Sequence, residues 1–126
     1  MIESLFAGGN YQSTQTLMDV ALERHRVLAG NLANSETPGY QRMDLDPTFE
    51  TTLQQMVATG TVVPEMGKKP IFSPERGLTP TAPDGNNVEV DRELMKINEN
   101  ALRYEALGQF VSGSLSRLRT AITGQT

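Results

Sequence analysis

Few residues of this 126-residue chain have a type and spacing that could support chemistry. The single histidine, His25, stands between two arginines on a segment with helical spacing, and no nucleophile or orienting acid accompanies it. Asp44 and Asp46 lie two residues apart, as paired acid–base carboxylates could. However, Asp46 directly precedes Pro47 and is better explained as the N-cap of a helix. Neither feature therefore indicates a catalytic site.

The acidic segment 84–91, Asp-Gly-Asn-Asn-Val-Glu-Val-Asp, has a superficial likeness to a calcium-binding loop. Its glycine is the second residue and its later acids have the wrong spacing for such a loop, so a turn followed by a helix start is the better interpretation. The absence of cysteine removes disulfides and thiolate metal sites. We therefore predict that the chain is not an enzyme and uses no metal and no cofactor.

The amino-acid composition limits the kinds of partner that we expect the chain to bind. The net charge of -4, without a run of Lys or Arg, argues against nucleic-acid binding. No stretch approaches about eighteen apolar residues, so we expect no membrane span, and the first six residues are too short for a secretory signal peptide. The hydrophobic fraction is 37% with no Trp, which is poor material for a compact globule, so we expect a partner to supply part of the buried surface.

The spacing of apolar residues and the positions of Pro and Gly predict the secondary-structure elements that position these residues. We predict an N-terminal helix over 11–33, a turn and extended segment over 34–45, and a short helix over 46–59. Prolines and glycines crowd the segment 60–87, which predicts an irregular loop or short hairpin. The predicted fold is one mainly α domain over 1–126, in which long N- and C-terminal helices pack as an antiparallel, coiled-coil-like pair.

The clearest pattern is a heptad repeat over 90–122, which predicts a helix about 48 Å long. Its positions, called the seam below, are Val90, Leu94, Ile97, Ala101, Tyr104, Gly108, Val111, Leu115, Leu118 and Ile122. We expect these residues, with Leu17 and Leu28 of the first helix, to form the contacts between helices, both within the chain and between copies. A self-contained helical bundle is the alternative interpretation.

A sharp corner follows the first helix, in the sequence 31–40, Asn-Leu-Ala-Asn-Ser-Glu-Thr-Pro-Gly-Tyr. Pro38 cannot continue a helix, and Pro-Gly at the centre fits a type II turn in which Gly39 has positive φ. We expect Asn31 and Asn34 to bond backbone groups across this corner or on a neighbour. The candidate residues of the corner are Asn31, Leu32, Ala33, Asn34, Thr37, Pro38, Gly39 and Tyr40.

The corner resembles the N-terminal signature of bacterial flagellar axial proteins, the family of rod, hook and hook-junction subunits. The segment 84–93 before the last helix resembles the second half of that pattern, and the short middle region is similar to that of proximal rod proteins. The resemblance implies a rod-type domain that polymerises through its terminal helices into an axial tube, which transmits torque and encloses the export channel. Implied partners are copies of itself, other rod subunits, membrane-ring and rod-adaptor proteins, and the flagellar type III export apparatus.

The resemblance also implies export to a periplasmic rod of the basal body without a cleaved signal peptide. Early export substrates share a Phe-x-x-x-aliphatic element, and Phe49 and Leu53 match it. The same two residues lie four apart on the apolar face of a helix, so ordinary packing explains them equally well. A soluble coiled-coil adaptor or secretion chaperone is the alternative function, although such a protein needs no rigid corner.

Overall fold

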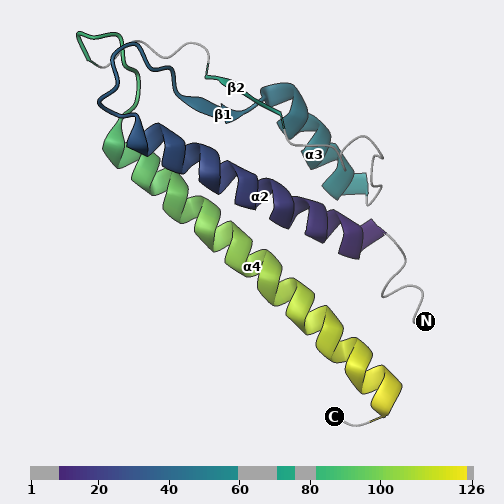
Figure 1. The fold of residues 1–126 in the computed structure, drawn as a ribbon. Coiled ribbons are helices and arrows are strands. Elements are labelled where there is room, and N and C mark those ends of the chain that lie inside the picture. Colours follow the sequence, from purple (N-terminus) through teal and green to yellow (C-terminus); the bar gives the residue numbers. More distant parts are fainter. Residues whose placement is uncertain (1–8, 60–70, 76–81, 125–126) are drawn as a thin grey trace.

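The computed structural model describes residues 9–59, 71–75 and 82–124. Its elements in chain order are α2 (Gly9–Ala33), β1 (Met43–Leu45), α3 (Pro47–Thr59), β2 (Phe72–Pro74) and α4 (Val90–Thr123). The helices α2 and α4 lie side by side and run in opposite directions, and α3 also contacts α2 (Figure 1). The prediction of a mainly α fold with an antiparallel pair of long helices is confirmed.

The ends of the helices follow from local chemistry. The Asp46 carboxylate accepts a hydrogen bond of 2.9 Å from the Thr48 backbone N–H, which confirms the predicted N-cap before Pro47. Helix α4 ends at Gly124, whose φ of 66° lets its N–H bond the Thr120 carbonyl oxygen at 2.8 Å. Helix α2 begins two residues before the predicted start at residue 11.

Two short strands connect the corner to the middle of the chain. They pair antiparallel in the register Met43 with Pro74 and Leu45 with Phe72. The strand β2 falls within the predicted irregular loop 60–87, of which 60–70 and 76–81 lie outside the described residues. A strand ending in Pro74 is tolerated because a two-stranded sheet has only edges, where a missing N–H leaves no ladder bond broken.

The apolar core lies where α2, α3 and β1 meet. It consists of Val20, Leu45, Phe49, Leu53 and Met56, with Leu17 and Phe72 packed against it. Leu28, further along α2, is fully buried. The residues Phe49 and Leu53 therefore belong to the core of the folded chain.

The seam forms only part of the inner face of α4, where a Cβ at its residue Gly108 would lie 3.9 Å from Met18 Cε of α2. Five of its residues, Val90, Leu94, Tyr104, Leu115 and Ile122, are at least 40% exposed, whereas the buried residues of α4 are Glu93 and Asn100. One physical reason is that a heptad repeat drifts by about 20° per heptad around a straight α-helix. A second reason is that α4 extends beyond the start of α2 (Figure 1). In the single chain much of the seam is thus unpartnered, and its role in assembly stays a prediction.

Two leucines at opposite extremes of exposure test the packing of the long helices. We expect Leu28→Ala to lower the free energy of unfolding by about 2 to 5 kcal/mol, because the residue is 0% exposed. The control Leu102→Ala, at 67% exposed, is expected to change it by less than about 0.5 kcal/mol. Urea unfolding followed by circular dichroism measures both, and equal losses would contradict the packing described.

Candidate functional site

The corner, residues 31–40, docks against the segment 84–88, called the docking segment below. The Gly39 backbone N–H donates to the Asp84 carbonyl oxygen at 3.0 Å. The buried Asn86 side chain donates to the Asn34 carbonyl oxygen at 2.9 Å and to that of Thr37 at 2.7 Å. The two halves of the sequence pattern, some fifty residues apart, thus form one joint at the end where α2 leads out and α4 begins.

A tight turn gives the corner its direction. The Tyr40 N–H donates to the Thr37 carbonyl oxygen at 3.2 Å, and Gly39 has a φ of 71°, which confirms the predicted positive φ. Gly85 of the docking segment also has positive φ, 85°, and a Cβ there would lie 3.8 Å from the Gly39 Cα. The Asn34 side chain donates to the Gly30 carbonyl oxygen at 2.8 Å, so it ends α2 as expected.

Asn31 connects the end of α2 to β1. Its fully buried side chain donates to the Met43 carbonyl oxygen at 2.7 Å and accepts from the Met43 N–H at 3.0 Å. An amide side chain has one donor face and one acceptor face, so it pairs with a backbone residue as a neighbouring strand would. The Tyr40 hydroxyl also donates to Asn31 Oδ1 at 3.1 Å. The expectation that Asn31 bonds backbone across the corner is confirmed.

The other predicted corner residues contribute backbone or a single contact. The Thr37 hydroxyl donates to Asn34 Oδ1 at 3.1 Å. Leu32 is half-buried, whereas Ala33 and Pro38 are exposed. The structure thus brings the asparagines, Thr37, Gly39 and Tyr40 together in the joint and leaves Ala33 and Pro38 at its surface.

A buried arginine, which the sequence interpretation missed, lies beneath the corner. The Arg42 side chain is 1% exposed, and its guanidinium bonds the carboxylates of Glu93, Glu75 and Asp44, the last at 3.0 Å. Glu93 is itself fully buried on the inner face of α4. Arg42, 51 residues away, shares no local pattern with Glu93, so the sequence offered no signal that would separate this glutamate from the other acids of α4.

Asp44 joins the same network from the other side. Arg24 of α2 donates two hydrogen bonds to its carboxylate, at 2.8 and 3.1 Å, and Lys96 of α4 lies at 3.5 Å. Burial alone would raise the pKa of Asp44, but the hydrogen bonds and charge of Arg24, with smaller contributions from the Leu45 N–H and Arg42, keep that pKa well below its usual range. Asp44 is therefore an ion-pair partner rather than half of an acid–base pair.

The remaining polar groups of the joint also have internal partners. The Asn87 side chain accepts the Arg42 backbone N–H at 2.7 Å, and Asn86 Oδ1 accepts the Val88 N–H at 2.8 Å. Burial and the nearby charge of Glu93 raise the pKa of Tyr40, which keeps its hydroxyl protonated as a donor. The side chains thus satisfy one another, which is the arrangement of a rigid joint.

His25 is exposed on α2. Among the described residues no group of three His, Cys, Asp or Glu side chains is placed to hold a metal ion. No helix in the described ranges is long and apolar enough to cross a membrane.

Comparison with curated proteins gives several relatives along nearly the whole chain. The chain is 37% identical to the flagellar basal body rod protein FlgB of Aquifex aeolicus, over 96% of this chain and 97% of the relative. It is 29% identical to FlgB of Escherichia coli, over 97% of each chain, and 28% identical to FlgB of Bacillus subtilis, over 96% and 98%. No model of a protein family matches the chain.

These similarities, with the two terminal helices and the docked segments between them, define a flagellar axial protein. Within that class, the chain belongs to the family of the flagellar basal body rod protein FlgB.

The depressed pKa of Asp44 makes the joint sensitive to acid. A carboxyl with a folded pKa below its unfolded value of about 3.9 stabilises the fold above that value. The contribution is lost as pH falls below about 3.9 toward the folded pKa, because the unfolded chain then binds a proton that the folded chain does not.

We therefore expect Asp44→Asn to lower the free energy of unfolding by about 3 kcal/mol at pH 7, since it removes the carboxylate that pairs with Arg24 and one of the three that bond Arg42. The difference from wild type should shrink in acid, measured by urea unfolding at pH 7 and pH 3. As a control, Asp19→Asn on the exposed side of α2 should change stability by less than about 0.5 kcal/mol. A constant Asp44→Asn deficit at both pH values would contradict the proposed ion pairing.

Alanine substitutions at two glycines test whether backbone conformation, rather than lack of space, requires glycine in the turn. A Cβ at Gly39 or at Gly113 would meet no atom within 4 Å, but only Gly39 has positive φ. We expect Gly39→Ala to destabilise by about 1 kcal/mol or more, because a side chain disfavours that conformation. Gly113→Ala, inside α4, should stabilise by about 0.5 to 1 kcal/mol. Opposite signs in thermal unfolding support the turn, and the same sign would count against it.

Proposed function

We propose that the chain is a structural subunit of the proximal rod of the flagellar basal body, and that it polymerises through its terminal helices into an axial tube. The observation that carries this proposal is the exposed seam of α4. Apolar side chains recur there at helical packing positions, yet Leu94, Tyr104 and Leu115 are between 40% and 46% exposed. An exposed, patterned apolar surface marks an interaction site.

The energetics favour burial of the seam between subunits. Removing an exposed Leu or Ile side chain from water contributes about 1.5 to 3 kcal/mol. Several such residues along α4 supply a large association energy once neighbouring copies cover them, whereas one isolated pair of helices covers few of them. The relatives are flagellar basal body rod proteins, which supports the same assembly.

The joint supports torque transmission. A tube that transmits torque needs a fixed angle between each subunit's helices and its outer segments. The buried network of Arg42, Asp44 and Glu93 provides such an angle, because moving one segment would leave a buried charge without its partner. In this assembly the terminal helices enclose the export channel, and the subunit performs no chemical step.

We also propose that the whole chain, 1–126, acts as one rod-type domain exported to the periplasmic rod without a cleaved signal peptide. Its partners in this role are copies of itself, other rod subunits, membrane-ring and rod-adaptor proteins, and the type III export apparatus. Phe49 and Leu53 are buried in the folded core, so the export apparatus could read them only on a chain whose α3 is undocked. Packing and export then use the same residues at different times.

Deletion and complementation test the function. Cells lacking the chain should be non-motile, and wild-type chain should restore motility and be recovered in purified basal bodies. Leu115→Asp should fail to restore motility, because it would place a carboxylate in the part of the seam that neighbouring copies are proposed to bury. The control Gln109→Asp changes an exposed residue of α4 that lies outside the seam and should complement. Normal rods without the chain would refute the proposal, and retention of the chain in the cytoplasm would favour the adaptor alternative.

A further inference from the structure

A groove lies where α2, α3 and α4 come together. Its volume is about 410 Å³. The floor is apolar, and α3 and α4 provide polar residues along its sides. The lining used in the argument below consists of Leu17, Val20, Leu53, Gln54, Glu50 and Arg103. Three helices thus border a space of the kind that a fourth helix fills in a bundle.

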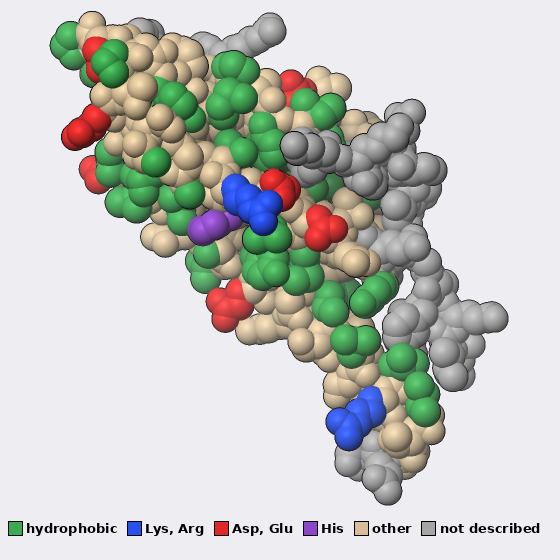
Figure 2. Space-filling view, in the orientation of Figure 1, with side chains coloured by type: hydrophobic (Ala, Val, Ile, Leu, Met, Phe, Trp, Pro, Cys, Tyr) green, Lys and Arg blue, Asp and Glu red, His purple; other side chains and the backbone are tan. Residues whose placement is uncertain are grey.

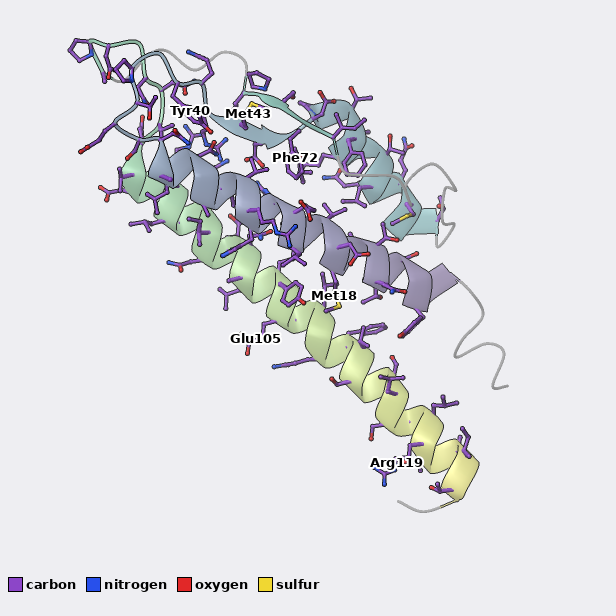
Figure 3. All side chains as sticks on the ribbon, in the orientation of Figure 1. Met18, Tyr40, Met43, Phe72, Glu105 and Arg119 are labelled. Atoms are coloured by element: carbon purple, nitrogen blue, oxygen red, sulfur yellow. The ribbon has the colours of Figure 1, made fainter. Side chains whose placement is uncertain are left out.

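The end of α4, residues 111–122, is a ridge with matching chemistry. It carries exposed Leu115 and Ile122 and half-buried Leu118, and it extends beyond the start of α2 (Figure 1). Figure 3 shows Arg119 on this extension. The segment contains two charges, Arg117 and Arg119, and no acid. On the face seen in Figure 2, this end shows hydrophobic and basic side chains without an acidic one.

We propose that the groove receives the end of α4 from a second copy of this chain. The inference rests on the proposed function, since it names the neighbour that covers part of the seam. A chain cannot fill its own groove in this way. Its α4 is one continuous helix, and the 12 residues from Arg103 to Leu115 span about 18 Å.

Charge complementarity favours this occupant. On the groove rim, Arg24 is paired with Asp44 and Arg103 lies near Glu99. The Glu50 carboxylate forms no ion pair with a described residue, and its side chain is exposed. A ridge with only basic charges therefore fits the rim better than an acidic or mixed helix, and its apolar residues fit the floor.

The location of the two surfaces predicts the type of assembly. Two copies that exchanged ridges would form a closed dimer, but a contact made in one direction only is heterologous, because the groove and the ridge are different patches of the molecule. Such contacts leave a free groove at one end and a free ridge at the other, and they continue into a filament unless the rotation closes a ring. An open-ended contact of this type is what a growing axial polymer requires.

Disulfide trapping tests the contact, since the natural chain has no cysteine. Full-length Gln54→Cys protein, with the new thiol in the groove, is mixed with full-length Ser114→Cys protein, with the new thiol on the ridge, under mild oxidation. The control replaces Gln54→Cys by Gln55→Cys, a neighbouring exposed position that does not line the groove. We expect the mixed dimer to form roughly tenfold faster with Gln54→Cys, the change that about 1.4 kcal/mol of preferred seating produces.

A yield with Gln54→Cys no higher than with Gln55→Cys would overturn the proposal, whether it is low or high in both. A second test removes residues 1–8 from the Ser114→Cys partner. If Gln54→Cys then reacts no faster than Gln55→Cys, the proposal is overturned, because residues 1–8 of the partner and not the end of its α4 would occupy the groove. The charge argument has its own test. Glu50→Arg should lower the Gln54→Cys yield several-fold, and Arg117→Glu with Arg119→Glu on the partner should restore it.

The same cysteine pair, introduced on two plasmids in motile cells, separates this inference from the proposed function. If the chain is recovered in basal bodies with a disulfide between positions 54 and 114, both the groove contact and the rod function are supported. If it is recovered there with no more disulfide than the Gln55 control, the groove contact is wrong and the rod function remains. If it is absent from basal bodies while rods form, the proposed function fails whatever the disulfide yield in solution.

Discussion

The buried guanidinium of Arg42 connects three parts of the chain that are far apart in sequence: the strand after the corner, the segment after β2, and the start of α4. Removing such a charge from water costs several kcal/mol, which only well-placed carboxylates offset. Because Glu93, Glu75 and Asp44 provide them together, each segment is positioned relative to the same group. A shift of one segment would leave a buried ion without its partner, so the joint has one favoured geometry.

The inner face of α4 extends this constraint along the helix pair. Its buried residues are polar, and Asn100 donates to the Ala21 carbonyl oxygen of α2 at 2.7 Å. Asn31 at the end of α2 also approaches Glu93, at 3.4 Å. Polar residues at helix-packing positions fix register at a cost in stability, since sliding the helices would leave them unpaired. The pair is thereby locked in register, and much of the apolar seam remains outside.

The local features of the fold could be predicted from the sequence, and the long-range ones could not. Pro47 after Asp46 located the start of α3, and Gly39 after Pro38 located the turn, because each depends on neighbouring backbone alone. The heptad period identified the apolar stripe of α4 but not the neighbour it meets, since a period records which residues are apolar and not what faces them. The role of Arg42 depends on partners up to 51 residues away and has no local signature.

These two kinds of contact suit an assembling subunit. The three carboxylates that bond Arg42 all belong to the same chain, so the geometry of this network does not depend on the concentration of neighbours. The apolar stripe is incomplete within one chain, and the energy it supplies grows with the area that neighbours cover. If the apolar residues had formed the inner face, the helix pair would be more stable alone but would offer little surface for association. Glu93 and Asn100 lie inside and Leu94 and Leu115 lie outside, so in the proposed assembly each copy would keep the same shape and the association energy would come from contacts between copies.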